Sequence, residues 1–257
     1  MNNLDKRIVD WLKDYIERSG LEYFVIGVSG GIDSAVTSTL CALTNKQVIV
    51  VSLPIHQENN QLTRANKHIE WLKFKFSNVE SKEIDLSQVY DQFKTTVYDN
   101  CLIEYSKELD INLALANSRS RLRMLALYQI ATSLKGLVVG TGNKVEDFGV
   151  GFYTKYGDGG VDISPIADLY KSQVRELGKT LGINSDIIEA APTDGLWEDD
   201  RTDEDQIGAS YDELEWAMGF DGDESTVSDR EKTVLTIYRD FNTKNKHKMN
   251  PIPIFKV

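Results

Sequence analysis

One stretch decides the fold of this chain: Tyr23-Phe24-Val25-Ile26-Gly27-Val28-Ser29-Gly30-Gly31-Ile32-Asp33-Ser34. Its first six residues are mostly apolar and rich in β-branched and aromatic side chains, which is typical of a buried strand. A glycine turn follows, and residues 35–43 then read as a helix. This order predicts a phosphate-binding loop, because glycines let the backbone approach a ligand and a helix N-terminus attracts anions. The alternative is an ordinary glycine turn capped by serine and aspartate.

The loop is not a Walker loop, which ends in Gly-Lys-Ser/Thr, because it contains no lysine. The order Ser-Gly-Gly-x-Asp-Ser at residues 29–34 resembles instead the pyrophosphate loop of enzymes that split ATP between its α- and β-phosphates. The resemblance implies that the loop holds the leaving pyrophosphate while the substrate is adenylated. Ser29 and Ser34 offer hydroxyl donors, and Asp33 offers a carboxylate that could hold a divalent metal beside phosphates.

Strands and helices alternate on both sides of this loop. Apolar runs at 47–53 and 136–140, and a short pair at Ile84 and Leu86, are expected as further strands. Helical spacing marks residues 4–16, 62–72, 89–97, 118–134 and 170–181. The alternation predicts a single Rossmann-like α/β domain over residues 1–257, with a doubly wound parallel sheet flanked by helices. Ligands bind at the carboxyl ends of such strands, so the glycine turns after Val28 and Val139 should open into one crevice.

Composition narrows the classes of function. The net charge of −11 argues against a nucleic-acid surface, which needs a basic stripe. The sequence has no apolar run of about 18 residues and no signal-peptide pattern at its start, so we expect a cytoplasmic protein without a membrane span. Cys41 and Cys101 form no metal or redox motif and are expected as free thiols. His56 and His68 are expected at the surface.

A second glycine turn, Gly140-Thr141-Gly142-Asn143-Lys144-Val145-Glu146, ends the last predicted strand. Thr141 could hydrogen-bond a nucleotide. Glu146 could share a Mg²⁺ ion with Asp33, because this ion is usually held by one or two carboxylates beside phosphate oxygens. An ordinary acidic residue at a helix N-terminus is the equally good alternative for Glu146.

Two polar segments follow. Lys155, Asp158 and Asp162 lie around an Asp-Gly-Gly sequence, and this composition suits a polar ligand better than a mere hairpin turn. Residues 194–205 are rich in aspartate and glutamate and are expected as a solvated loop, with a lid over the site as the alternative.

Together these blocks resemble ammonia-dependent NAD synthetase, in the sequence order of that family. The blocks are 29–34, 140–146, 152–160, 168–177, Ala191-Pro192-Thr193 and His247-Lys248. The resemblance implies ATP as co-substrate, Mg²⁺ as cofactor, deamido-NAD and ammonia as substrates, and a homodimer whose dinucleotide site uses both subunits. Neither cysteine has the context of a glutaminase nucleophile, so free ammonia, or ammonia from a separate protein, is the expected nitrogen source.

The resemblance also assigns roles to residues. ATP contacts are implied for Gly27, Val28, Ser29, Gly30, Gly31, Ile32, Asp33, Ser34, Thr141, Lys171 and Thr193. Deamido-NAD contacts are implied for Arg121, Lys155, Asp162, His247 and Lys248. Mg²⁺ ligands are implied for Asp33 and Glu146. The candidate catalytic residues are Asp33, Lys171 and Asp158, the last of these for handling ammonium.

Several residues and the function have alternative interpretations. Lys171 has a solvent-facing lysine at a helix start as its alternative. Arg119 and Arg123 are expected at the surface in salt bridges, with secondary contacts to the substrate as the alternative. Ser52 stands where many relatives have an arginine, which leaves the adenine contacts undefined. The rival functions are another pyrophosphate-loop enzyme, such as one resembling GMP synthetase, and a non-catalytic nucleotide-binding module. The polar block at 155–160 disfavours the first rival, and a paired metal carboxylate disfavours the second.

Overall fold

The structure is a computed structural model that describes residues 3–57, 59–100, 108–193, 195–196 and 201–256. Its strands are β1 (Tyr23–Gly27), β2 (Gln47–Ser52), β3 (Val79–Glu83) and β4 (Gly136–Val138). Its longer helices are α1 (Leu4–Ser19), α2 (Ile32–Ala42), α3 (Asn59–Lys75), α4 (Ser87–Asn100), α5 (Glu108–Leu134), α6 (Lys171–Leu181), α9 (Tyr211–Gly219) and α10 (Asp229–Met249). Shorter elements are the π-helix η2 (Val145–Val150), α7 (Ser185–Ile188), α8 (Asp203–Ile207) and the 3₁₀ turn η3 (Glu224–Thr226).

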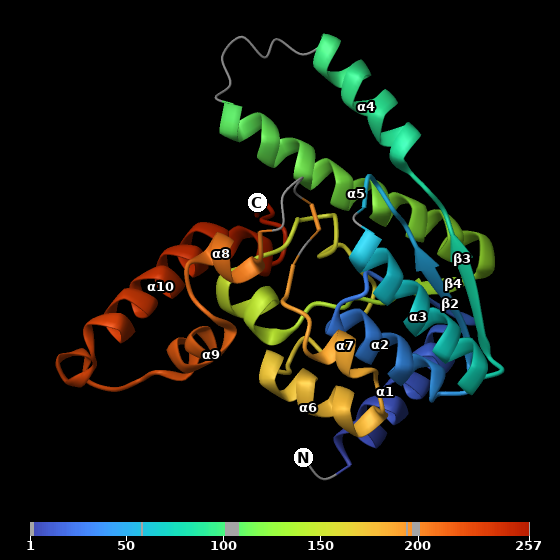
Figure 1. Ribbon diagram of the computed structural model, residues 1–257, viewed down its shortest axis with the longest axis horizontal. Helices are drawn as coiled ribbons and strands as arrows, with labels where there is room; N and C mark the ends of the chain where they lie inside the picture. Colours follow the sequence, from blue (N-terminus) through green and yellow to red (C-terminus); the bar gives the residue numbers. More distant parts are fainter. Residues whose placement is uncertain (1–2, 58, 101–107, 194, 197–200, 257) are drawn as a thin grey trace.

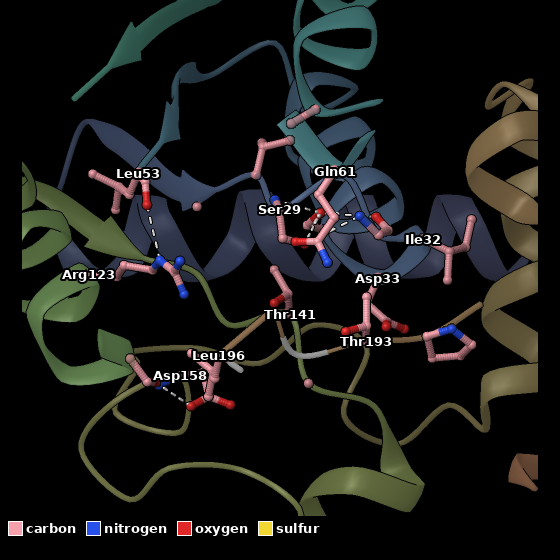
Figure 2. Close-up of a pocket in the computed structure, with 18 of the residues that line it drawn as sticks. Ser29, Ile32, Asp33, Leu53, Gln61, Arg123, Thr141, Asp158, Thr193 and Leu196 are labelled. Atoms are coloured by element: carbon pink, nitrogen blue, oxygen red, sulfur yellow. Dashed lines mark hydrogen bonds between the residues drawn. The ribbon is translucent and has the colours of Figure 1, made fainter. Parts of the chain in front are cut away.

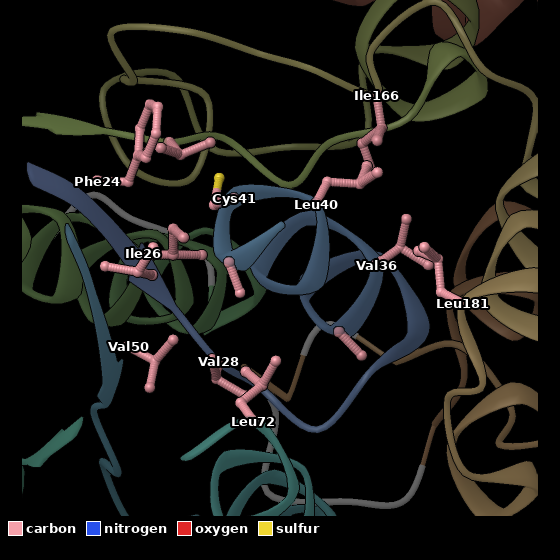
Figure 3. Close-up of a cluster of buried hydrophobic side chains, with 14 of the residues drawn as sticks. Phe24, Ile26, Val28, Val36, Leu40, Cys41, Val50, Leu72, Ile166 and Leu181 are labelled. Carbon is pink, nitrogen blue, oxygen red and sulfur yellow. The ribbon is translucent and has the colours of Figure 1, made fainter. Parts of the chain in front are cut away.

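The strands form one parallel sheet in the order β3-β2-β1-β4 (Figure 1). Alternate side chains of β1 enter opposite cores, since Phe24 and Ile26 face α1, α2 and α3 while Val25 faces α5. Figure 3 shows Phe24, Ile26 and Val50 in the first core, with Val36 and Leu40 of α2. Helices therefore cover both faces of a parallel sheet, and the predicted fold class is confirmed.

The third strand lies earlier than expected. It spans Val79–Glu83, where only Val79 is buried, and not the apolar pair Ile84 and Leu86. An edge strand with β2 as its neighbour needs few buried side chains, so the apolar signal was weak there. The backbone N–H groups of Ile84 and Leu86 still donate to Ser52 and Pro54, which continues the pairing beyond the strand.

A helical layer lies beside the sheet, where α8, α9 and α10 pack on η2 (Figure 1). The acidic segment contributes to it, contrary to the expected solvated loop. Asp203 opens α8 and is buried, and Asp205 accepts hydrogen bonds from Thr202 in a capping box. Residues 194 and 197–200 of that segment lie outside the described residues.

Several smaller expectations are settled by burial. Cys41 is a free, buried thiol as predicted, whereas Cys101 lies outside the described residues. His56 is exposed as expected, but His68 is buried at 3% exposure. The prediction for His68 was wrong because its side chain turns inward from α3 onto Ser38 of α2, with Nε2 at 3.0 Å from the hydroxyl. Within the described ranges, no helix has the length and apolar character that a membrane crossing requires.

Candidate active site

The glycine-rich loop turns sharply between β1 and α2. Gly30 has φ +86, and a Cβ there would lie 2.4 Å from the carbonyl oxygen of Gln61 and 3.0 Å from the nitrogen of Ala65. Only glycine fits, because the backbone is left-handed and the start of α3 packs directly against it. The predicted need for glycine at this turn therefore has two physical causes, the φ angle and the contact with α3.

The loop presents its amides where α2 begins. Within the described residues, the N–H groups of Ile32, Asp33 and Ser34 have no backbone acceptor, as expected for the first turn of a helix. The hydroxyls brace the loop, with Ser29 Oγ 3.2 Å from Ser34 Oγ, and Ser34 Oγ donating to the carbonyl of Gly31 at 3.0 Å. The arrangement is that of an anion-binding helix N-terminus.

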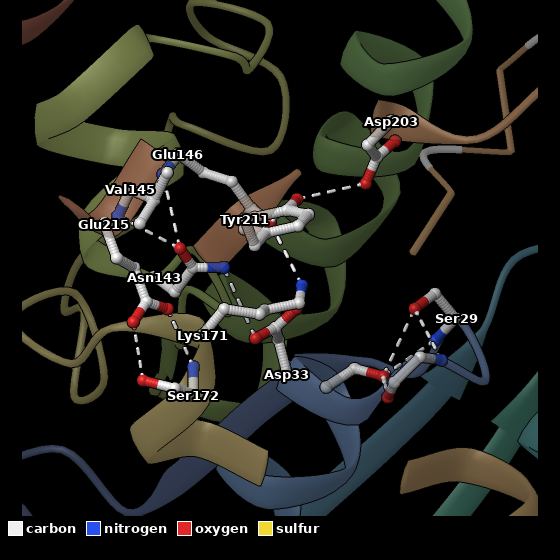
Figure 4. A network of polar contacts seen from close by, with 12 residues as sticks. Ser29, Asp33, Asn143, Val145, Glu146, Lys171, Ser172, Asp203, Tyr211 and Glu215 are labelled. Atoms are coloured by element: carbon white, nitrogen blue, oxygen red, sulfur yellow. Dashed lines mark hydrogen bonds and ion pairs between the residues drawn. The ribbon is translucent and has the colours of Figure 1, made fainter. Parts of the chain in front are cut away.

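A buried lysine joins the two predicted metal ligands (Figure 4). Nζ of Lys171 lies 2.5 Å from Asp33 Oδ2 and 3.1 Å from Glu146 Oε1. Lys171 is 2% exposed, so the alternative of a solvent-facing lysine is wrong. Burial lowers the pKa of Lys171, but the charges of Asp33 and Glu146 outweigh it and hold the pKa above its usual range. Burial raises the pKa of Asp33, and Lys171 opposes this effect.

Further polar groups hold these three side chains in place (Figure 4). Asn143 donates to Asp33 Oδ1 at 3.5 Å and accepts from the backbone N–H of Val145 and Glu146. The hydroxyl of Tyr211, from α9, lies 2.5 Å from Glu146 Oε1, to which it can donate a hydrogen bond. It also lies 3.2 Å from Asp203 Oδ2. Tyr211 and Asp203 were not predicted as site residues, because they belong to the helical layer that only tertiary packing brings to the sheet.

The two glycine turns open into one cavity of about 270 Å³, as predicted. Its lining includes the predicted residues Gly27, Val28, Ser29, Gly31, Ile32, Asp33, Ser34, Thr141, Glu146, Asp158, Lys171 and Thr193. Figure 2 shows Asp33, Thr141, Thr193 and Asp158 around this space. The lining also carries the cations Arg64 and Arg123 and the acids Asp147 and Asp203.

Asp158 lies across the cavity from Ser29 and Ile32 (Figure 2). Its Oδ1 accepts from Ser120 Oγ at 2.6 Å and from the backbone N–H of Thr154 at 3.0 Å. Desolvation raises the pKa of Asp158, and these hydrogen bonds oppose the rise. Desolvation and neighbouring carboxylates raise the pKa of Asp147 to about 8. The cavity thus combines an anion-binding end with an acidic end.

Four of the five predicted dinucleotide residues lie together, but outside the cavity lining. Nζ of Lys155 donates to the carbonyl of His247 at 2.8 Å, and Nε of Arg121 donates to the carbonyl of Lys155 at 3.2 Å. Lys248 donates to the carbonyls of Gly151 and Tyr153. The last turn of α10 is therefore docked on the 151–155 segment.

Asp162 is the predicted site residue that the structure leaves apart from this group. Its carboxylate accepts from the hydroxyl of Tyr128 at 3.0 Å and from the backbone N–H of Val138 at 2.8 Å. These bonds tie the loop to the end of β4.

Two arginines expected at the surface are not there. Arg119 is 6% exposed, packs over the ring of Tyr90 and donates to the carbonyl of Leu196. Arg123 lines the cavity and donates to Leu53 and Gln57 (Figure 2). Their helix, α5, covers the sheet face beside the cavity, and the periodicity of its apolar residues did not reveal that these two side chains point inward.

The fold and this cavity define an ATP-using α/β enzyme of the pyrophosphate-loop class. The model of one family, NAD synthase, matches residues 4–251. The chain belongs to the NAD synthase family.

Named relatives agree with that family. The chain is 39% identical to the NH(3)-dependent NAD(+) synthetase of Methanococcoides burtonii, over 81% of this chain and 75% of the relative. It is 34% identical to the enzyme of the same name from Saccharolobus solfataricus, over 97% and 87%. The predicted ligase of NAD biosynthesis is thereby confirmed, and the rival pyrophosphate-loop functions are not favoured.

Solved structures match over nearly the whole chain. An NMN synthetase from Francisella tularensis superposes with a TM-score of 0.86 at 32% identity, over 99% of this chain and 98% of that one. The NH3-dependent NAD synthetase from Campylobacter jejuni, solved in complex with the nitrate ion, gives a TM-score of 0.77 at 26% identity, over 99% and 98%.

Proposed function

We propose that this chain amidates deamido-NAD with ammonia through an adenylate, and releases AMP and pyrophosphate in the cytoplasm. One observation carries the proposal: Lys171, Asp33 and Glu146 meet at the mouth of the anion-binding loop, in the same cavity as Asp158. A carboxylate is a poor electrophile, so its oxygen first attacks the α-phosphorus of ATP and the bond to the β-phosphate breaks. The resulting mixed anhydride then accepts ammonia.

The loop is suited to the first step. The amides of Ile32, Asp33 and Ser34, which have no backbone acceptor among the described residues, would bind the β- and γ-phosphates and stabilise charge on the leaving pyrophosphate. Lys171 would bind a phosphate oxygen after its ammonium group moves away from Asp33 and Glu146. Thr141 and Thr193, which both line the cavity (Figure 2), would contact the remainder of ATP.

The carboxylates of Asp33 and Glu146 fit a Mg²⁺ site. They are hard oxygen donors that share one cation, Lys171. Mg²⁺ commonly takes one or two carboxylates and completes its shell with phosphate oxygens and water. When bound there, the ion would neutralise charge on the phosphates.

Asp158 would act in the second step. Ammonium must lose a proton before it can attack, and a carboxylate with a raised pKa is a better base for that proton. Ser120 and Thr154 fix the orientation of this carboxylate. Its position across the cavity from Ser29 and Ile32 would place it beside the acyl group rather than the phosphates.

The dinucleotide would extend from the cavity towards Arg121, Lys155, His247 and Lys248. Asp162, which accepts from Tyr128 and the backbone of Val138, would make a contact apart from this group. A homodimer would complete the site. Exposed apolar side chains on α4 and α5, namely Val89, Phe93, Val97 and Leu113, would suit a second copy of the chain.

A second substrate is favoured by one observation. The matched Francisella structure, with a TM-score of 0.86 over 99% of this chain, is an NMN synthetase by name. The acid form of that product, nicotinic acid mononucleotide, carries the same reacting carboxylate without the adenylate half.

The test is pyrophosphate release from ATP and Mg²⁺ by the purified protein. Deamido-NAD, nicotinic acid mononucleotide and no acceptor are compared, each with ammonium or with glutamine. The proposal expects release that requires deamido-NAD and ammonium, with NAD⁺ as product. Tenfold higher kcat/KM with the mononucleotide would transfer the function to NMN synthesis, and release without an acceptor would contradict both.

A further inference from the structure

Among the cations around the cavity, Arg64 lies against the pyrophosphate loop and has no carboxylate partner in the described part of the chain. Three cations line the cavity: Lys171, Arg123 and Arg64. Lys171 is held by Asp33 and Glu146, and Arg123 donates to Leu53 and Gln57. Arg64, on α3, donates through Nε to the carbonyl of Gly30 at 3.3 Å. Among the described residues, that carbonyl is the only acceptor of its side chain.

The position of Arg64 is fixed by the packing of α3 on the loop. A Cβ on Gly30 would lie 3.3 Å from the Cβ of Arg64 and closer still to the backbone of Gln61 and Ala65. Figure 2 shows Gln61, from the preceding turn of α3, next to Ser29. The side chain of Arg64 therefore begins next to the loop, and its Nε contacts the loop at Gly30.

The cavity needs positive charge at this point. Its lining carries five carboxylates, on Asp33, Glu146, Asp147, Asp158 and Asp203, against three cations, and the whole chain carries −11. ATP adds several negative charges, and more charge develops on the bridging oxygen as pyrophosphate leaves. A guanidinium presents two N–H-bearing ends in a fork that matches phosphate oxygens.

We propose that Arg64 is a catalytic residue that binds the β- and γ-phosphates through its Nη groups and stabilises the leaving pyrophosphate. The carboxylate oxygen of the substrate bonds to the α-phosphorus, the bond from this phosphorus to the bridging oxygen breaks, and the electron pair stays on pyrophosphate. Arg64 neutralises that charge and transfers no proton. This assignment rests on the proposed function for the identity of the acyl substrate, but not for the binding of pyrophosphate.

Two substitutions and one control distinguish a role of Arg64 in binding phosphate from a role in the structure of the loop. Arg64→Ala removes the charge, and Arg64→Lys keeps the charge without the fork. Lys67→Ala, one turn along the same helix, removes a cation whose exposed pair with Asp186 at 3.4 Å lies outside the cavity lining. An exposed pair of this kind contributes little to stability.

The measurements are calorimetric titrations of each protein with magnesium pyrophosphate and with AMP, alongside kcat for pyrophosphate release and thermal melting. We expect Arg64→Ala to weaken pyrophosphate binding at least tenfold and to lower kcat about 100-fold, with AMP affinity within threefold of wild type. Arg64→Lys should lie between, and Lys67→Ala should match wild type.

Two results would overturn the assignment. If the affinities for AMP and for pyrophosphate fall equally in the Arg64 variants, the residue only supports the loop. If neither affinity falls, Arg64 binds no phosphate. Should Arg64→Ala fail to fold, Arg64→Lys applies the same comparison. The two proposals can fail separately. If pyrophosphate binding depends on Arg64 but the wild-type protein makes no NAD⁺, the proposed function is contradicted and the role of Arg64 in binding pyrophosphate is still supported.

Discussion

Nζ of Lys171 lies 2.5 Å from Oδ2 of Asp33, although 138 positions separate the two residues in the chain. Asp33 belongs to the first turn of α2 and Lys171 to the first turn of α6. The packing of these two helices on each other therefore brings the pyrophosphate loop to the residues that follow the second glycine turn.

Replacing Lys171 with methionine should abolish most of the activity. It leaves Asp33 and Glu146 close together without a cation, so they repel each other or take up a proton. We expect kcat to fall at least 100-fold and the free energy of unfolding to fall by about 3 kcal/mol. Lys179→Met, on the exposed side of α6, is the control. Activity within fivefold of wild type would show that the lysine is only structural.

Gly30→Ala should distort the loop. The added Cβ would meet the carbonyl oxygen of Gln61 at 2.4 Å, in a left-handed backbone conformation. We expect a loss of about 1–3 kcal/mol in stability and a lower kcat/KM for ATP. Urea unfolding and steady-state kinetics measure the two effects. Gly219→Ala, which meets nothing within 4 Å, should change neither, and an unchanged Gly30→Ala would contradict the geometry.

Asp158→Asn should separate the two half-reactions. Adenylation needs the loop, so exchange of labelled pyrophosphate into ATP with deamido-NAD present should stay within a few-fold of wild type. Amide formation from ammonium should fall about 100-fold or more. Asp212→Asn, exposed on α9, serves as control. Equal loss of both activities would place Asp158 outside the ammonia step.

Removal of Mg²⁺ with EDTA should stop NAD⁺ formation, and added Mg²⁺ should restore it. Glu146→Gln removes one of two carboxylate ligands, so we expect the Mg²⁺ concentration for half-maximal rate to rise about tenfold. Glu176→Gln, exposed on α6, should leave it unchanged. A full rate in EDTA, or an unchanged Mg²⁺ requirement in Glu146→Gln, would contradict the metal site.

The stability of the protein should fall on mild acidification because of His68. Burial lowers the pKa of His68 to about 4 from an ordinary value of 6.5, so between these values the unfolded chain binds the proton and the folded one does not. Stability from this residue is present above pH 6.5 and is lost as the pH falls towards 4, at up to about 1.4 kcal/mol per pH unit.

His68→Gln tests this point, since it should flatten that part of the pH dependence measured by urea unfolding. His56→Gln, at an exposed position, should keep the wild-type slope. An unchanged slope in His68→Gln would mean that another group titrates.

The sequence was sufficient for the parallel sheet, the loop and the shared crevice, because each depends on local patterns: the apolar run before Gly27, the glycines, and the turn after Val139. Local patterns were not sufficient for β3, whose charged residues read as loop. They also did not reveal that Arg119, Arg123 and His68 point inward, since an amphipathic pattern favours charged and polar side chains on the outside of a helix.

The contributions of Asp203 and Tyr211 had no local signal at all. Tyr211 reaches Glu146, and Asp203 reaches Tyr211, only because α8 and α9 pack with η2. The order of the motifs, in contrast, indicated the family from the sequence alone. The structure gives the physical reason for that order, since the blocks at 29–34, 140–146 and 152–160 all supply residues to one cavity.

The oxygen atoms of the substrate carboxylate report directly on adenylation. Deamido-NAD labelled with ¹⁸O in the nicotinic carboxylate is converted with ATP, Mg²⁺ and ammonium, and the products are read by mass spectrometry. Adenylation transfers one carboxylate oxygen to phosphorus, so AMP should carry one ¹⁸O and pyrophosphate none. Unlabelled AMP, or label in inorganic phosphate with ADP as the other product, would contradict an acyl-adenylate on this loop.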